Sequence, residues 1–181
     1  MKRLVMIGYR GSGKSVVGAC VAGQLGWEFL DTDDLIESST ACSIAEIFER
    51  SGEAEFRRVE RRVIRECQDL TDVVIATGGG AVLSEETRRD WCDPETHVVW
   101  LTGTADELAD RIASDGTTGQ RRPSLTGQSV LEEIVTVLET RTPLYAESAD
   151  TTVATGGRSI SQVAEIVLAS VPDSRDPDSE T

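Results

Sequence analysis

Residues 8–15 of the 181-residue chain read Gly-Tyr-Arg-Gly-Ser-Gly-Lys-Ser and match the spacing G-x-x-x-x-G-K-[ST]. The apolar run Leu4–Ile7 precedes this stretch, and a helical pattern, Lys14–Leu25, follows it. In such a strand–loop–helix unit, glycines let backbone N–H groups surround an anion, and the helix N-terminus adds partial positive charge. Lys14 can bridge the β- and γ-phosphates, and the Ser15 hydroxyl can ligate Mg²⁺. The stretch predicts a phosphate-binding loop (P-loop) for ATP or GTP.

Short apolar runs recur along the chain and alternate with longer segments of 3.6-residue periodicity. Three helical segments begin with a capping box, at Ser43–Glu46, Thr104–Glu107 and Ser159–Gln162. The strand candidates are Leu4–Ile7, Glu28–Leu30, Val73–Ala76, Val98–Leu101 and Thr151–Ala154. This alternation predicts a three-layer α/β/α fold, in which helices cover both faces of a mainly parallel sheet. Ligands of such sheets bind at the carboxyl ends of the strands.

Two segments interrupt the alternation. Helical patterns without a strand follow the second strand candidate, and at about 33–62 we expect a helical insert that walls off a substrate. A stretch rich in Gly, Thr and Arg predicts a mobile lid at about 114–127. The acidic segment 172–181 cannot build a core and is expected to be disordered. We therefore expect one domain, residues 1–171.

Charge and hydropathy exclude several classes of partner. The chain has 18 Lys and Arg against 32 Asp and Glu, a net charge of −14. So acidic a surface argues against binding to nucleic acid or to an anionic membrane. No apolar run approaches the roughly 18 residues that span a bilayer. We expect a cytoplasmic protein without nucleic-acid or membrane partners, and its size fits a monomer.

The histidine and cysteine content excludes several kinds of site. His97 is the single histidine, which argues against a Ser-His-Asp triad or a His-rich metal site and favours a packed or solvated imidazole. The four cysteines, Cys20, Cys42, Cys67 and Cys92, form no Cys-x-x-Cys pair, so they lack zinc spacing. We expect them to be reduced thiols, buried or half-buried.

Polar residues follow the second and third strand candidates. At the end of the second strand, one carboxylate of Asp31 and Asp33 can hold Mg²⁺, directly or through water, while the other accepts the proton of an attacking hydroxyl. Either residue can instead cap the helix that begins near Asp33. Gly78–Gly80 follow the third strand and suit the close approach of a hydroxyl-rich or anionic substrate, although a plain flexible turn also fits.

Arginine supplies most of the positive charge, since the chain has only two lysines. Arg121 and Arg122 lie in the expected lid, where an arginine can reach a transferring phosphoryl group. Arg141 comes just before the conformationally restricted Thr142–Pro143 step. The pattern leaves a surface role open for each of these arginines. Charge pattern alone also does not select Arg57 from the charged helix that contains it.

Taken together, these stretches resemble shikimate kinases. The resemblance rests on the P-loop and on Leu-Asp-Thr-Asp-Asp-Leu-Ile-Glu (30–37), Ser-Ile-Ala-Glu-Ile-Phe (43–48), Gly-Glu-x-Glu-Phe-Arg-Arg-x-Glu (52–60), Gly-Gly-Gly-Ala (78–81), Arg-Pro-x-Leu (122–125) and Arg-x-Pro-Leu-Tyr (141–145). These motifs occur in order, and the middle ones are specific to that family. The resemblance implies a nucleoside-monophosphate-kinase-like fold with a five-stranded parallel sheet, a helical substrate-binding insert and an arginine-bearing lid.

The resemblance also implies a reaction: the γ-phosphoryl of ATP passes to the 3-hydroxyl of shikimate, giving shikimate 3-phosphate and ADP on the route to chorismate and the aromatic amino acids, with Mg²⁺ as cofactor. Its catalytic residues would be Lys14, Asp33, which orients or deprotonates the hydroxyl, and Arg122 of the lid. The implied binding residues are Gly11, Ser12, Gly13, Lys14, Ser15, Val16, Arg122 and Arg158 for ATP; Asp33, Arg57, Gly78, Gly79, Gly80 and Arg141 for shikimate; and Ser15 and Asp31 for the metal.

The chain departs from the family pattern at one P-loop position and leaves two alternatives open. Val16 stands where many members carry a second hydroxyl, and Arg121 can share the lid role with Arg122. A kinase of the same fold can act on another acceptor, such as gluconate or a nucleoside monophosphate. A nucleotide-binding module without transfer activity is the other alternative, although the lack of an Asn-Lys-x-Asp motif argues against a GTPase.

Overall fold

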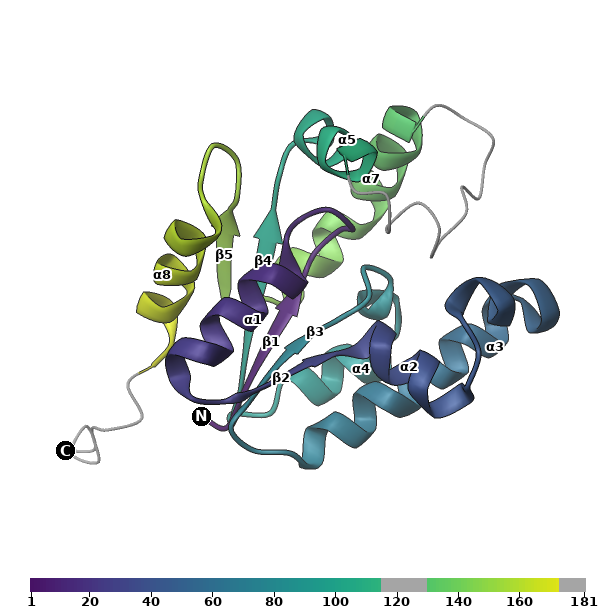
Figure 1. The fold of residues 1–181 in the computed structure, drawn as a ribbon, viewed down its shortest axis with the longest axis horizontal. Coiled ribbons are helices and arrows are strands. Elements are labelled where there is room, and N and C mark those ends of the chain that lie inside the picture. The colour runs from purple at the N-terminus through teal and green to yellow at the C-terminus, as the bar shows by residue number, and fades with distance from the viewer. Residues whose placement is uncertain (115–129, 173–181) are drawn as a thin grey trace.

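The computed structural model describes residues 1–114 and 130–172 (Figure 1). Its elements are β1 (Arg3–Ile7), α1 (Lys14–Leu25), β2 (Glu28–Asp31), α2 (Thr32–Thr40), α3 (Ile44–Glu66), the 3-10 turn η1 (Cys67–Asp69), β3 (Val73–Ala76), the 3-10 turn η2 (Ala81–Leu83), α4 (Glu85–Trp91), β4 (Thr96–Thr102), α5 (Ala105–Ser114), α7 (Val130–Ser148), β5 (Thr151–Ala154) and α8 (Ile160–Ser170). The predicted lid after Ser114 and the tail after Pro172 lie outside the described residues. In the described ranges, no helix is long and apolar enough to cross a membrane.

The five strands form one parallel sheet in the order β2-β3-β1-β4-β5. The central strand β1 pairs with β3 on one side, where Met6 lies opposite Ala76, and with β4 on the other, where Ile7 lies opposite Trp100. All five residues of β1 are buried, as its apolar sequence predicts. Because β1 is central, the P-loop that follows it emerges at the middle of the carboxyl edge, where ligands of parallel sheets bind.

Helices cover both faces of this sheet (Figure 1). On one face, α1 and α8 pack against the strands through residues such as Val21 and Val167. On the other face, α3, α4 and α7 contribute Ile64, Trp91 and Tyr145 to a second core. The predicted three-layer α/β/α fold with a five-stranded parallel sheet is therefore confirmed.

The edge strands correct one part of the prediction, which expected strands buried on both faces. In β2, Glu28 is exposed and the other three residues are half-buried. In β5, Thr152 and Ala154 are exposed while Val153 is buried. An edge strand lacks a neighbour on one side, so helices cover it less completely. β4 is also longer than predicted, because threonines at both its ends join the ladder.

The helix starts follow the sequence closely. Ser43 and Ser159 each form the predicted capping box. At the start of α5, the Thr104 backbone N–H donates to Glu107 over 2.9 Å, and the Glu107 N–H donates to the Thr104 hydroxyl over 3.2 Å. Gly52, with φ of 78°, divides α3 into two parts. The predicted insert is thus a helical unit of α2 and α3 beside the sheet (Figure 1).

The predictions for histidine and cysteine hold with one exception. His97 is buried in β4, and its Nε2 lies 3.1 Å from the Thr151 hydroxyl, which confirms a packed imidazole. All four cysteines are free thiols. Burial raises the pKa of the Cys67 thiol to about 11, and the nearby charge of Glu66 adds to this. Cys92, however, is exposed, because it lies just after the short surface helix α4.

Candidate active site

The P-loop has the geometry of an anion-binding loop. Gly11 and Gly13 have φ of 77° and 92°, values that L side chains rarely adopt, and Gly13 is the N-cap of α1. The buried Lys14 Nζ donates a 2.8 Å hydrogen bond to the Tyr9 carbonyl and lies 3.5 Å from the Ser12 hydroxyl. The ammonium group therefore lies against the loop itself. A triphosphate that binds here meets this charge together with the first amides of α1.

Ser15 and Asp31 come together beside the P-loop. The Ser15 hydroxyl donates to the Asp31 Oδ2 over 2.6 Å. Burial raises the pKa of the Asp31 carboxyl, and the hydrogen bond from Ser15 offsets part of this increase. A hydroxyl and a carboxylate are hard oxygen donors, and Mg²⁺ binds few protein ligands when phosphates and water complete its shell. The two residues thus fit Mg²⁺, and no larger cluster of His, Cys, Asp or Glu exists in the part of the chain that the structure describes.

The start of α2 separates the roles of the two aspartates. Asp31 is the N-cap of α2, and its Oδ1 accepts a hydrogen bond from the Asp33 backbone N–H over 2.9 Å. N-capping of α2 therefore explains the presence of an aspartate at position 31, but it gives no role to the half-buried Asp33 side chain. Between them, the buried Thr32 hydroxyl accepts a 3.1 Å hydrogen bond from the Gly78 N–H. This bond joins the start of α2 to the glycine triplet, Gly78–Gly80.

Arg57 reaches the glycine triplet from α3. Its guanidinium donates to Glu60 over 2.6 Å and to Glu53 over 3.1 Å, and it lies 5.1 Å from the centre of the Phe56 ring. Burial lowers the pKa of Arg57, but the two carboxylates outweigh burial and the net pKa is raised, so the group stays charged. The guanidinium is so close to Gly80 that a Cβ built on Gly80 would lie 2.3 Å from Nη1. Only a glycine leaves room for Arg57 in this position.

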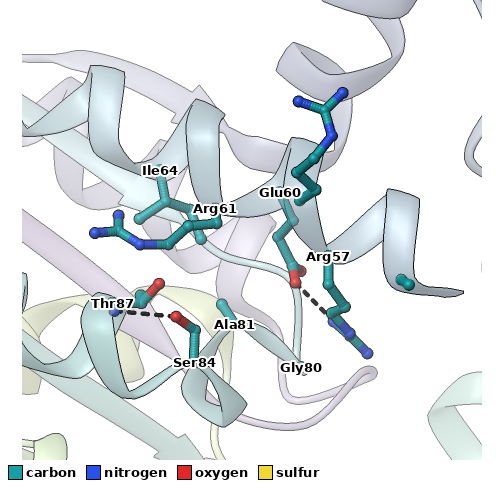
Figure 2. Close-up of a pocket in the computed structure, with 10 residues that line it drawn as sticks. Arg57, Glu60, Arg61, Ile64, Gly80, Ala81, Ser84 and Thr87 are labelled. Atoms are coloured by element: carbon teal, nitrogen blue, oxygen red, sulfur yellow. Dashed lines mark hydrogen bonds and ion pairs between the residues drawn. The ribbon is translucent and has the colours of Figure 1, made fainter.

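A cavity of about 280 Å³ lies beside Arg57, between α3 and the segment η2–α4. Gly80, Ala81 and Ser84 line it from one side, and the α3 side chains line it from the other (Figure 2). Neither Asp33 nor the P-loop contributes to its lining. The cavity therefore adjoins the predicted acceptor site rather than enclosing it.

Arg141 reaches the same triplet from α7. Its Nη1 donates to the Gly79 carbonyl over 3.0 Å, and the Tyr145 hydroxyl donates to the same oxygen over 2.5 Å. Pro143 lies between these two residues inside α7, so the helix continues through a step whose sequence disfavours it. The predicted acceptor residues Arg57 and Arg141 therefore approach adjacent glycines from two different helices.

A further arginine contact, made by Arg111, is absent from the sequence prediction. From α5, its Nη1 donates to the Thr155 hydroxyl over 2.8 Å and to the Gly11 carbonyl over 3.3 Å, which links the P-loop to the loop after β5. Arg158 lies in that same loop, exposed, and its Nη1 donates to the Ala154 carbonyl over 2.6 Å. Arg111 occupies an ordinary last-turn position of a helix, so no local pattern marks it. Arg121 and Arg122 lie outside the described residues.

This arrangement defines a P-loop phosphotransferase with a helical insert for a second substrate. The P-loop follows the central strand, the insert follows β2, and Thr32 at the start of α2 and two guanidinium groups contact the turn after β3. A site of this class positions an acceptor and stabilises the charge of a transferring phosphoryl group.

Comparison with known proteins identifies the family. The family model described as shikimate kinase matches residues 10–172. The shikimate kinase of Rhodopirellula baltica is 40% identical over 178 residues, covering 96% of this chain and 92% of the relative. That of Synechococcus sp. is 39% identical over 170 residues, with coverage of 93% and 84%. A solved shikimate kinase from Acinetobacter baumannii, in complex with shikimate, superposes with a TM-score of 0.86 at 33% identity and coverage of 93% and 91%. The chain belongs to the shikimate kinase family, and the resemblance in the sequence motifs is confirmed.

Proposed function

We propose that the protein transfers the γ-phosphoryl group of ATP to the 3-hydroxyl of shikimate. The observation that carries this proposal is the convergence on one glycine triplet of Arg57, Arg141 and the helix start that bears Asp33, beside a complete P-loop. A carboxylated polyol needs donors for its carboxylate and an acceptor for the reacting hydroxyl proton. Planar guanidinium groups meet the first need, since they bind carboxylates in a bidentate manner.

On the phosphate side, Gly11, Ser12 and Gly13 supply backbone amides, and Lys14 supplies positive charge to the β- and γ-phosphates. Val16 is exposed in the first turn of α1 and offers its backbone amide. Arg158, in the loop after β5, lies on the side of the sheet away from the insert, where we place the adenine. Arg122 is assigned to the transferring phosphoryl group from its sequence motif alone.

Ser15 and Asp31 would hold Mg²⁺, with Asp31 acting through water. The ion, when bound with ATP, would supply positive charge that offsets the negative charge of the phosphates. The hydrogen bond from Ser15 to Asp31 keeps both oxygens on the P-loop side of α2 before nucleotide binds.

On the acceptor side, Asp33 takes the proton of the 3-hydroxyl as that oxygen bonds to the γ-phosphorus. The bond from the γ-phosphorus to the bridging oxygen breaks, and ADP leaves with the electron pair. Arg57 and Arg141 bind the shikimate carboxylate, and Gly78–Gly80 line the pocket. A monomeric state, a cytoplasmic location and the lack of nucleic-acid or membrane partners stay predictions from composition.

A coupled assay of ADP release tests the acceptor, with shikimate, gluconate and AMP offered separately. We expect release with shikimate alone; stimulation by gluconate or AMP only would contradict the proposal. Asp33→Asn is expected to lose at least about 100-fold in kcat, the usual contribution of a general base, with unchanged ADP affinity. Asp34→Asn is the matched control, because Asp34 is the exposed neighbour in the same helical turn.

A further inference from the structure

We infer that Arg10 and Glu133 act as positioning residues that couple nucleotide binding at the P-loop to acceptor binding at Arg141. This inference rests on the proposed function, since it concerns the same two substrates. It assigns a role to two residues for which the sequence motifs give none. A closed circuit of contacts joins the P-loop, the glycine triplet and α7.

The first contact joins the P-loop to the glycine triplet. A Cβ built on Gly79 would lie 3.2 Å from the Gly8 carbonyl oxygen and 3.4 Å from the Arg10 nitrogen. The backbone of Gly79 therefore packs directly against the backbone of the P-loop. A displacement of the loop at Arg10 reaches Gly79 without any intervening side chain.

The second contact joins the triplet to α7. The Gly79 carbonyl accepts hydrogen bonds from the Arg141 guanidinium, over 3.0 Å, and from the Tyr145 hydroxyl, over 2.5 Å. Tyr145 is buried in the core beneath the sheet, so this end of α7 is fixed. The position of Arg141 is thereby tied to the peptide that touches the P-loop.

The third contact closes the circuit. The Arg10 Nη2 pairs with the Glu133 Oε1 over 3.0 Å, and the two side chains are only 18% and 8% exposed. Glu133 lies two helical turns before Arg141 on α7, a separation of about 12 Å at 1.5 Å per residue. Beside this pair, Tyr9 packs with Leu108 and Ile134 in a small core that also binds the loop to α7.

These contacts hold α7 against the P-loop at two separated points, so the loop and Arg141 should move together. A nucleotide that orders the P-loop therefore also orders Arg141, and the acceptor then binds without bearing that ordering cost. By thermodynamic reciprocity the acceptor strengthens nucleotide binding by the same factor. Both side chains of the pair are largely removed from water. Salt therefore screens their attraction less than it screens that of an exposed surface ion pair.

Calorimetric titration tests this coupling: shikimate is titrated into the protein alone and into the protein saturated with Mg²⁺ and ADP. We expect ADP to tighten shikimate binding at least about five-fold, the lower end of typical coupling. In the double variant Arg10→Met with Glu133→Leu, which removes both charges of this ion pair, this ratio should fall below about two-fold. The affinity for ADP alone should change by less than about two-fold, and the shikimate KM should rise more than kcat falls.

Two further variants separate coupling from mere stability. Arg10→Lys keeps a cation opposite Glu133 and should retain most of the ratio. Arg3→Met removes a buried arginine at the amino end of β1, where it pairs with Asp93 over 2.5 Å, far from the P-loop. This variant should lower Tm and leave the ratio unchanged. A ratio of one in the unaltered protein, or an unaltered ratio in the double variant, would overturn the inference. Failure of shikimate to bind in any state would instead overturn the proposed function.

Discussion

Replacement of Gly80 by alanine tests the acceptor site by adding a methyl group next to Arg57 without changing any charge. The new methyl group would lie 2.3, 2.5 and 2.6 Å from Nη1, Nη2 and Cζ of Arg57. Ordinary contacts between heavy atoms are about 3.5 Å, so the guanidinium must move by about 1 Å or more. The backbone at Gly80, with φ of −99° and ψ of −5°, is open to alanine. The substitution thus displaces Arg57 while its charge remains.

The size of the effect follows from the bond that is lost. One hydrogen bond to a charged group contributes about 1.5–3 kcal/mol, which corresponds to roughly a 10- to 150-fold weaker interaction with the shikimate carboxylate. We expect the KM for shikimate in the Gly80→Ala variant to rise by about this factor, and the KM for ATP to stay within about two-fold. Arg57 is a flexible side chain at its far end, so Tm should fall by only a few degrees.

Steady-state kinetics of ADP release, with each substrate varied in turn, measures both constants. Gly23→Ala is the matched control, because a Cβ on Gly23 has no atom within 4 Å and the residue lies in α1. That variant should keep both KM values and gain about 0.5–1 kcal/mol of stability from helix propensity. An unchanged shikimate KM in Gly80→Ala would refute the reasoning that the position of Arg57 over this glycine matters for acceptor binding.

Three more predictions use burial and pKa. Burial raises the pKa of Asp31, so its ionised form costs stability. Asp31→Asn should therefore raise Tm near neutral pH in thermal melts, and the difference should shrink as pH falls from the raised pKa of the folded state towards the ordinary aspartate value, while Mg²⁺-dependent activity is lost. Burial lowers the pKa of His97, so the native state binds fewer protons than the unfolded chain. Stability should therefore fall as pH drops below 6.5. Thermal melts of His97→Asn should not show this fall in stability. A thiol reagent should modify the exposed Cys92 first, and it should modify Cys67 only on unfolding, since burial raises that pKa to about 11; mass spectrometry of partly labelled protein checks the order.

Local sequence patterns predicted the elements that depend on local interactions. The helix Lys14–Leu25 and the strands Val73–Ala76 and Thr151–Ala154 have the predicted bounds. The capping boxes also form, because each one is complete within four residues. The P-loop is predictable for the same reason, since its strand, glycines and helix are contiguous in the chain.

Features that depend on neighbours in space were predicted less well. The exposure of β2 and β5 follows from the strand order, which no single strand encodes. The family motif selected Arg57, whereas its charge pattern did not distinguish it from Arg58 on the same helix. Arg10 and Arg111 were missed, because their partners lie 123 and 44 residues away in the chain.

The strand order has a consequence for how substrate preference can change. β2 and β3, with the helical insert, lie on one side of β1, whereas β4 and β5 lie on the other. The helical insert and the loop after β5, where we place the adenine, therefore lie on opposite sides of the P-loop, although Arg141 reaches the glycine triplet from α7, between β4 and β5. A chimera that imports another helical insert in place of residues 32–66 leaves the P-loop, β4 and β5 unaltered, so such architectures can diversify by exchanging the insert.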